Sequence, residues 1–286
     1  MIEAESANFE VTMMCRVLGV SRSGYYYWRK SSKAEERAQR HSELLDTIEE
    51  VHLDSHGIYG SPRIHFVLSS QGVQASVNTV ARLMQFAGIA GRVRRKYRTT
   101  TDSDHGRAVA RNVLKRDFGA SEPDSVWCTD ITAVRTKSGF VYLAVVIDVA
   151  TRLVVGWSME RQMKTSLVVA ALEQALAWRE PAQGIIHHSD RGTQYTSKRY
   201  RKLLKTHDIR CSMSRKGNCW DNALMESFFG SYKQEWAHHY DYAGLVAARA
   251  SAFEYIERFY NRHRLHSSLG YRTPAAVDAA VSEAVA

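Results

Sequence analysis

The sequence predicts an α/β protein in which a mixed-sheet domain is preceded by small all-α segments and followed by a helical tail. Strand-like apolar runs alternate with helical patterns between about residues 120 and 240, whereas residues 1–91 and 241–286 show helical periodicity alone. Three acidic residues, Asp130, Asp190 and Glu226, fall within or directly after the elements of the α/β region. Their setting makes them the first candidates for chemistry.

Length and composition restrict the class of protein. A chain of 286 residues predicts about two domains, and a net charge of +9 with a pI of about 9.4 favours a polyanionic partner, nucleic acid first. The four cysteines are scattered without a C-x-x-C pair, which argues against a zinc site and suits a reducing cytosol. The acidic start is unlike a signal peptide, and the longest membrane-like run, residues 142–150, is too short to span. We therefore expect a cytoplasmic protein with no membrane partner.

Two helical segments precede the sheet. Residues 1–35 predict a helix, the turn Gly19-Val20-Ser21 and a second helix, which is either a short helix-turn-helix or a generic αα-hairpin. Residues 36–91 predict a second helix-turn-helix-like domain, with Pro62 in the first turn of one helix and Ser76 capping another. Three polar residues of that last helix are expected to face a DNA groove: Asn78, Thr79 and Arg82.

A basic linker, residues 92–119, joins the helical segments to the α/β region. Its first residues form a dense positive run, consisting of Arg92, Arg94, Arg95, Lys96 and Arg98. Such a run between two domains is well placed to bind DNA phosphates, although a merely solvated charge run has the same composition.

Residues 120–240 contain the pattern of the central domain. Strands are expected at 126–133, 140–149 and 153–160, then a helix at 165–178, a strand at 184–189, a helix at 197–207, a strand at 209–213 and a helix at 220–236. The second and third strands are expected to pair antiparallel. This order is that of the RNase H-like fold, whose sheet is mixed, and residues 241–286 form its helical tail.

Asp130 lies inside the first predicted strand, Asp190 ends the fourth, and Glu226 lies on the last helix. The gaps leave 59 and 35 intervening residues. Three carboxylates brought together by a sheet and a helix can hold two Mg²⁺ ions, with Mn²⁺ as a substitute. A two-metal site of this kind can catalyse the cleavage and joining of phosphodiester bonds. The alternative to a metal site is that the three acids have separate structural roles. Asp130 would then be a buried strand acid, Asp190 a turn former and Glu226 part of a solvated helix flank. Asp148, at another strand end, is interpreted as a turn former.

The helix at 220–236 places further polar groups near the glutamate. At about 100° per residue, Asn222, Glu226 and Lys233 fall within about 40° of one another, beside a broad apolar face. The stripe thus offers a carboxylate for metal, an amide for hydrogen bonds and a cation for DNA.

These motifs resemble the catalytic protein, often called OrfB, of bacterial insertion sequences of the insertion-sequence-3 family. The matching segments are residues 127–132, reading Trp-Cys-Thr-Asp-Ile-Thr, residues 188–195, reading His-Ser-Asp-Arg-Gly-Thr-Gln-Tyr, and residues 221–229, reading Asp-Asn-Ala-Leu-Met-Glu-Ser-Phe-Phe. Residues 59–64 and 266–271 match as well, so the resemblance covers nearly the whole chain. Retroviral integrases share the fold and the acidic triad but usually carry a zinc-binding segment that this chain lacks.

The resemblance implies a DDE transposase that acts in the bacterial cytoplasm, at the nucleoid. It implies Asp130, Asp190 and Glu226 as metal ligands, Lys233 as a contact to the element's end, and nicking of the 3′ end by water followed by attack of that 3′-hydroxyl on DNA. The partners expected are double-stranded DNA at element ends and target, a second copy of the chain on DNA, and an upstream-frame protein or a frameshift fusion with it. A non-enzymatic DNA-binding regulator and a nuclease that cuts without joining are the alternatives.

Overall fold

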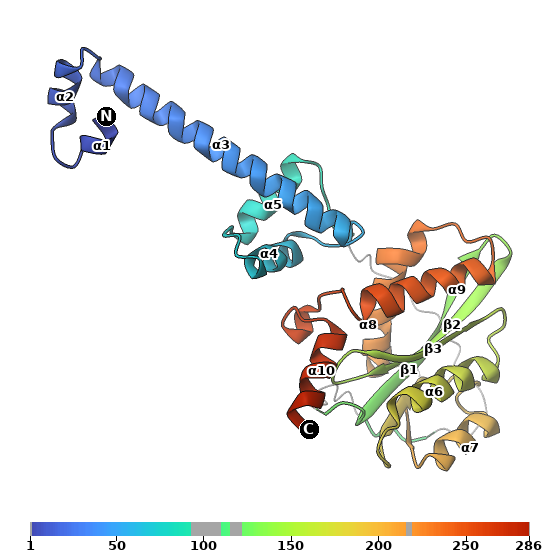
Figure 1. Ribbon diagram of the computed structural model, residues 1–286. Coiled ribbons are helices and arrows are strands. Elements are labelled where there is room, and N and C mark those ends of the chain that lie inside the picture. Colours follow the sequence, from blue (N-terminus) through green and yellow to red (C-terminus); the bar gives the residue numbers. More distant parts are fainter. Residues whose placement is uncertain (1, 93–109, 115–121, 216–218, 286) are drawn as a thin grey trace. The chain divides into compact units, whose positions relative to one another are not determined.

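The computed structural model describes residues 2–92, 110–114, 122–215 and 219–285. The chain divides into two compact units, Met1–Gly91 and Arg92–Ala286, which are described separately (Figure 1). None of the helices within the described ranges is both long and apolar enough to cross a membrane.

The first unit is helical. Its elements are α1 (Ile2–Glu5), α2 (Val11–Val17), α3 (Arg22–Asp54), α4 (Ser61–Ser70) and α5 (Val77–Phe86). Helix α3 differs from the expectation, because the boundary predicted at residue 35 falls inside one continuous helix of 33 residues. No glycine or proline lies between Gly24 and Gly57, and the middle of α3 is rich in Ala, Glu, Arg and Leu, which favour helix. The two segments predicted before the linker therefore share one helix.

The end of this unit matches its sequence signals. Pro62 lies in the first turn of α4, and Ser76 caps α5 by accepting a hydrogen bond from the Thr79 amide at 3.1 Å. The inward faces of α3, α4 and α5 meet in a small core of buried aliphatic and thioether side chains, consisting of Ile48, Ile64, Leu68, Val80 and Met84.

The second unit contains a five-stranded mixed sheet in the order β3-β2-β1-β4-β5. The strands are β1 (Val126–Thr136), β2 (Gly139–Asp148), β3 (Val154–Glu160), β4 (Ile186–Ser189) and β5 (Arg210–Met213). β1 pairs antiparallel with β2 and parallel with β4, so β1 lies at the centre of the sheet. β2 pairs antiparallel with β3, as the sequence predicts, and β4 pairs parallel with β5. The mixed sheet expected from the element order is confirmed.

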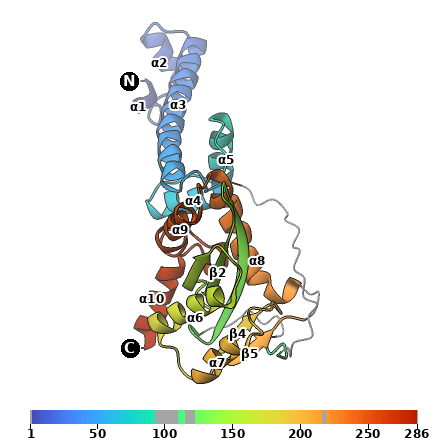
Figure 2. The ribbon, with the colours of Figure 1, turned by 90° about the vertical axis from the view of Figure 1, so that its right-hand side faces the viewer.

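Helices cover both faces of this sheet (Figures 1 and 2). On one face, α6 (Thr165–Arg179) and α7 (Lys198–Thr206) bury a core that includes Trp127, Ala144 and Val146. Side chains alternate along a strand, so the residues between these face the other way. That second face is covered by α8 (Ala223–Ser231) and α9 (Leu245–Phe253), which pack against β1 and, in the case of α9, also β3.

The helix predicted at 220–236 is interrupted. A 3₁₀ turn, η1 (Cys219–Asn222), precedes α8, and a π-helical turn, η2 (Tyr232–Trp236), follows it. Tyr232 and Trp236, at the two ends of the π turn, both pack on Tyr255, with ring centroids 5.1 and 5.6 Å away. An extrapolation at 100° per residue from Glu226 to Lys233 therefore does not hold.

The tail belongs to the same unit as the sheet. It continues through η3 (Ala237–His239), α9, the π-helical turn η4 (Glu254–Tyr260), η5 (Ser267–Leu269) and α10 (Pro274–Val285). A buried ion pair joins the end of this region to η2. Arg264 donates from Nε and Nη2 to the two carboxylate oxygens of Glu235, each at 2.6 Å, and both side chains are less than a tenth exposed. Tyr255 donates its hydroxyl to the same carboxylate at 3.2 Å.

The Glu235–Arg264 pair gives a stability prediction. Glu235→Ala leaves a buried guanidinium without its carboxylate, and we expect the free energy of unfolding to fall by about 3–5 kcal/mol. The double variant Glu235→Leu with Arg264→Met removes both charges and should recover most of that loss. Urea titrations measure both values, and a loss below about 1 kcal/mol in the single variant would contradict the assigned role.

His187 supplies a second, pH-dependent contribution. It is buried on β4 and shares a 2.6 Å hydrogen bond with the Tyr200 hydroxyl of α7. Burial, with the neighbouring His188, lowers the pKa of His187 from 6.5 to about 3. The folded protein therefore keeps His187 neutral, whereas the unfolded chain protonates it below about pH 6.5.

Stability should consequently fall as the pH drops below 6.5, by about 1.4 kcal/mol per pH unit for this side chain. Between pH 7 and pH 5, we expect the free energy of unfolding of His187→Phe to fall by about 2 kcal/mol less than that of the unsubstituted protein. Urea titrations at each pH give the slope of the free energy of unfolding against pH. Loss of the Tyr200 hydrogen bond lowers the stability by the same amount at every pH and so does not alter this slope. The exposed His207→Gln of the same unit is the control, and an unchanged slope in His187→Phe would refute this role of the histidine.

Candidate active site

Asp130 lies on the central strand, on the face opposite α6. Its neighbours Thr129 and Ile131 pair with Val146 and Ala144, which belong to the core under α6. Strand alternation therefore directs Asp130 to the face covered by α8. The Ile131 amide donates to Asp130 Oδ1 at 2.8 Å, and the side chain is partly buried.

Asp190 follows β4 at the same level of the sheet. The parallel register pairs Cys128 with His188, so Asp130 and Asp190 each lie two positions beyond a paired residue on adjacent strands. The Gly192 amide donates to Asp190 Oδ1 at 2.8 Å. A β-carbon at position 192 would lie 2.9 Å from that oxygen, so any larger residue would displace the carboxylate.

Glu226 comes from α8, which packs against β1. The side-chain Nδ2 of Asn222, just before the helix, donates to the Thr129 carbonyl oxygen at 3.4 Å. This bond joins the start of α8 to the residue preceding Asp130. Leu224, Met225 and Phe228 are buried beneath the helix, while Glu226 is partly exposed beside them. This packing brings the glutamate to the face that carries Asp130.

The three carboxylates act on one another electrostatically. The pKa of Asp130 is well above its usual range, first because the group is buried, then because the negative charges of Asp190 and Glu226 are close. The Ile131 amide and the Lys233 ammonium act in the opposite direction. Burial lowers the pKa of Lys233, partly offset by the charge of Asp130. The triad and the lysine therefore share one electrostatic site.

Tyr195 supports this site from the α6 side. Its hydroxyl lies 3.3 Å from Thr129 Oγ1, and its side chain is buried. Burial raises the pKa of Tyr195, and the nearby charges of Asp130 and Asp190 raise it further. The phenol thus stays neutral beneath the two aspartates.

The donor set fits a hard divalent cation, because carboxylate oxygens are the ligands that Mg²⁺ prefers and a cation offsets the repulsion that raises the Asp130 pKa. Within the described ranges, however, no three His, Cys, Asp or Glu side chains are gathered closely enough to form a ready metal cluster.

A buried carboxylate that the sequence did not single out holds the start of α8. Asp221 is fully buried and accepts hydrogen bonds from Asn112 Nδ2 and from the Arg215 amide, Nε and Nη2, each at 2.9 Å. His188 lies between Ser212 Oγ and Ser214 Oγ, at 2.8 and 3.2 Å, and fixes β4 to β5 just before Asp190. The sequence signal for Asp221 is its place at the start of the motif at residues 221–229, although no role was expected for it.

The other predicted site residues have different positions. Asn222, expected to contact DNA, is 5% exposed and fixes α8 to β1 instead, because it precedes the helix rather than lying on its outer stripe. Arg92 donates to the Glu235 carbonyl oxygen. Asn78 and Arg82 are exposed on α5 in the first unit, and Thr79 is partly buried against the Ser76 cap. Four linker residues lie outside the described part of the chain: Arg94, Arg95, Lys96 and Arg98.

Asp148 has the structural role that the sequence indicates. It is fully buried and accepts hydrogen bonds from the Thr151 amide, the Thr151 hydroxyl and the Asp124 amide, each at 2.7 Å. These bonds close the turn after β2, so this acid is distinct from the triad.

Family models match three parts of the chain. Residues 120–219 and 207–274 match two models described as integrase core domain, and residues 39–97 match a model described as HTH-like domain. The first match contains Asp130 and Asp190, and the second contains Glu226 and Lys233. Integrase core domains depend on a divalent metal and carry polynucleotidyl transferase activity.

Solved structures with similar folds are more distant. One chain of the simian T-cell lymphotropic virus intasome in complex with PP2A regulatory subunit B56 gamma has a TM-score of 0.48 and 15% identity, covering 80% of this chain and 73% of that chain. The HTLV-2 integrase catalytic core domain in complex with magnesium has a TM-score of 0.40 and 16% identity, covering 54% of this chain and 96% of that chain.

Curated relatives extend over nearly the full length. Transposase InsF for insertion sequence IS3A of Escherichia coli (strain K12) is 41% identical over 274 residues, which cover 96% of this chain and 95% of the relative. The insertion element IS600 uncharacterized 31 kDa protein of Shigella sonnei is 41% identical over 263 residues, which cover 92% of this chain and 96% of that relative. Together with the integrase core and the acids on its sheet, this similarity establishes that the chain belongs to the IS3 family of transposases.

Proposed function

We propose that Asp130, Asp190 and Glu226 are the metal ligands with which this transposase cleaves and joins DNA strands, and that the metal is Mg²⁺, bound as a pair. The proposal rests on the parallel pairing of β1 and β4, which puts both aspartates at one level of the sheet face on which α8 carries the glutamate. The mutual electrostatic effect of the three carboxylates supports it.

Two reactions use the same site. In the first, a water molecule loses a proton as its oxygen bonds to the phosphorus at the element's end. The bond from that phosphorus to the 3′ oxygen breaks, and the 3′ oxygen takes up a proton to leave a 3′-hydroxyl. In the second, this 3′-hydroxyl loses its proton as it bonds to another phosphorus, and the oxygen displaced there takes up a proton. The bound metals would activate the attacking oxygen and stabilise the leaving one.

The chain's own groups hold these reactants in place. Lys233, within the electrostatic field of Asp130, is suited to a DNA phosphate or base at the element's end. The Gly192 amide restricts the Asp190 carboxylate, and Tyr195 contacts Thr129, the residue before Asp130 in β1. Asn222 and Asp221 keep the start of α8, and with it Glu226, against β1.

DNA binding beyond the site is proposed for α5 and the basic linker. Asn78 and Arg82 are exposed on α5, within the HTH-like match, and suit a DNA groove together with Thr79. Two element ends must meet for strand transfer, so we propose at least a dimer on double-stranded DNA, acting in the bacterial cytoplasm. An upstream-frame protein, separate or as a frameshift fusion, is proposed to contribute to end recognition.

The triad gives the first functional prediction. Asp130→Asn, Asp190→Asn and Glu226→Gln each keep the size of the side chain but remove the charge that a metal requires, so we expect cleavage and joining to be lost while DNA binding survives. The assay uses Mg²⁺, a labelled duplex with the element's end, and a second duplex with a pre-cut 3′ end. Asp241→Asn, an exposed acid of the same unit, is the matched control. Full joining in any triad variant would exclude that residue as a ligand.

The linker gives the second. Replacing Arg94, Arg95 and Lys96 by alanine should weaken DNA binding for any sequence and reduce the slope of log K against log salt by about 0.9 for each phosphate that the variant no longer neutralises. Fluorescence anisotropy between about 50 and 200 mM salt measures the slope. An equal removal of three charges from α7, at Arg199, Lys202 and Lys205, is the control, and an unchanged slope in the linker variant would show that the run is only solvated.

A further inference from the structure

The N-terminal hairpin of the first unit has the geometry of a helix-turn-helix. Helix α2 ends where the Val20 amide donates to the Cys15 carbonyl oxygen at 3.0 Å, and Gly19 between them has a positive φ of 65°. Ser21 then starts α3 by accepting a hydrogen bond from the Gly24 amide at 3.0 Å. A short helix, a tight glycine turn and a capped second helix thus follow one another within residues 11–24.

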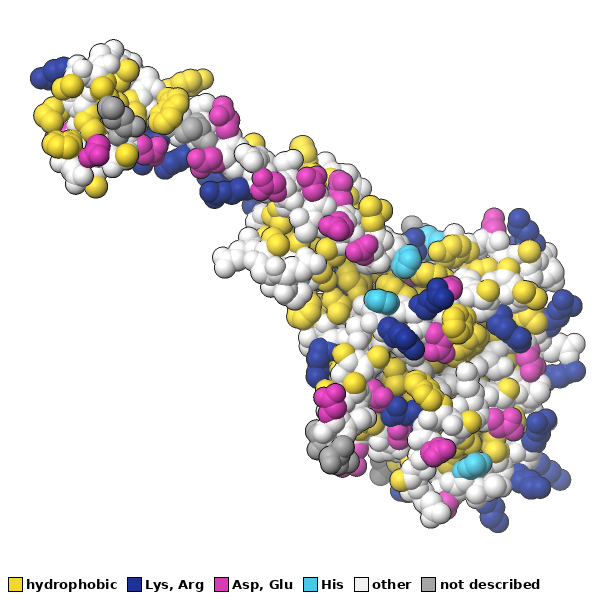
Figure 3. Space-filling model, in the orientation of Figure 1, with side chains coloured by type: hydrophobic (Ala, Val, Ile, Leu, Met, Phe, Trp, Pro, Cys, Tyr) yellow, Lys and Arg dark blue, Asp and Glu magenta, His cyan; other side chains and the backbone are white. Residues whose placement is uncertain are grey.

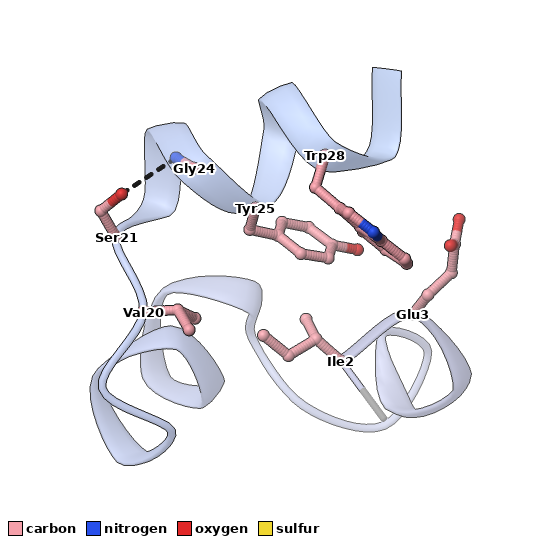
Figure 4. Close-up of a pocket in the computed structure, with 7 residues that line it drawn as sticks. All are labelled: Ile2, Glu3, Val20, Ser21, Gly24, Tyr25 and Trp28. Atoms are coloured by element: carbon pink, nitrogen blue, oxygen red, sulfur yellow. Dashed lines mark hydrogen bonds between the residues drawn. The ribbon is translucent and has the colours of Figure 1, made fainter. Parts of the chain in front are cut away.

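One side of the first turns of α3 is anchored inside the hairpin. Tyr25 is 6% exposed and, with Trp28, faces Ile2 and Val20 across a small cavity of about 470 Å³ (Figure 4). Cys15 of α2 is buried on the same side. Because the inward residues fix the rotation of α3, its opposite side is held toward solvent.

That opposite side carries basic residues in a row. At about 100° per residue, the row lies within a sector of about 80° and extends about 27 Å along α3. Its members are all exposed and consist of Arg22, Lys30, Lys33, Arg37 and Arg40. Tyr26 lies in the same sector, and the Arg22 guanidinium is placed over its ring, 5.9 Å from the centroid. This set is the α3 basic face.

Acidic residues are distributed differently along the same helix. Glu35 lies on the far side of α3, and Glu36 lies at the margin of the sector. The remaining acids belong to the C-terminal half of α3, where magenta side chains gather in Figure 3: Glu43, Asp46, Glu49, Glu50 and Asp54. The N-terminal half therefore presents a strip of one sign of charge.

We propose that the α3 basic face is a second DNA-binding surface of this transposase, separate from α5 and the linker. Arg22 and Tyr26, in the first turns after the hairpin, are suited to the edges of bases in the major groove. The four basic residues beyond them are suited to consecutive phosphates: Lys30, Lys33, Arg37 and Arg40. Residues 39–97 carry the HTH-like match, so all of this face except Arg40 precedes it.

The charge distribution selects DNA over a second copy of the chain. Two copies of a face with only positive charge repel, whereas duplex DNA carries one negative charge per about 1.7 Å along its axis and releases counterions when lysines and arginines replace them. The strip spans about 27 Å, the length of roughly eight base pairs. The proposal depends on the proposed function only for the class of ligand, since the residues are independent of the acidic site.

The test uses the full chain with Lys30, Lys33, Arg37 and Arg40 replaced by glutamine, which keeps helix propensity. Its binding to a labelled duplex with the element's end, and to an unrelated duplex of equal length, is measured by fluorescence anisotropy between about 50 and 200 mM salt. We expect the slope of log K against log salt to fall by about 3–4, because each phosphate contact contributes about 0.9. Arg22→Ala should in addition reduce the preference for the element's end.

A matched control removes four charges from α7, at Lys198, Arg199, Lys202 and Lys205. Its slope of log K against log salt should stay close to that of the unsubstituted chain. An unchanged slope in the α3 variant, or an equal fall in the α7 control, would overturn the proposal. So would an altered sedimentation coefficient with unaltered DNA affinity, since it would assign the face to a second copy of the chain.

The outcome is distinct from a failure of the active-site proposal. At about 50 mM salt and saturating DNA, the α3 variant should still join pre-cut 3′ ends, because the acidic site is intact. Glu226→Gln should show the reverse, with full binding and no joining. Loss of joining in the α3 variant even at saturation would contradict a role limited to binding.

Discussion

The structure depends on the parallel pairing of β1 with β4 at the centre of the sheet. That pairing places Asp130 and Asp190 level with each other, and alternation along β1 directs Asp130 to the face covered by α8. Burial, and then the nearby charges of Asp190 and Glu226, raise the pKa of Asp130, so the ionised form of this carboxyl is disfavoured here. The contacts around the three acidic residues hold these like charges close together in the fold.

Much of that support comes from hydrogen bonds at the ends of elements. His188 is held by two serine hydroxyls just before Asp190, and Asp221 collects four hydrogen bonds just before α8. Farther from the site, the buried Glu235–Arg264 pair joins the turn that carries Lys233 to the C-terminal region. The integrase core match extends to residue 274 and so includes both residues of this pair.

The sequence predicted the strands and the mixed sheet, because period-two burial and polar residues at strand ends depend on local pattern. The common metal site of the three acids stays a prediction. The sequence did not predict the π turn at Tyr232–Trp236, whose first and last residues pack against Tyr255 from a later part of the chain. It also missed the partnership of Glu235 with Arg264, which are 29 positions apart. The length of α3 was missed for a different reason: the predicted division at residue 35 has no helix-breaking residue to support it.

We propose that Asp130, Asp190 and Glu226 together hold the metal used for strand transfer. The most direct measurement is anomalous scattering from Mn²⁺ in crystals of the full chain bound to a pre-cut element end. We expect metal density bridged by carboxylate oxygens of all three residues, at coordination distances of about 2.0–2.2 Å. Metal bound elsewhere in the second unit, with the three carboxylates turned away from it, would contradict the claim.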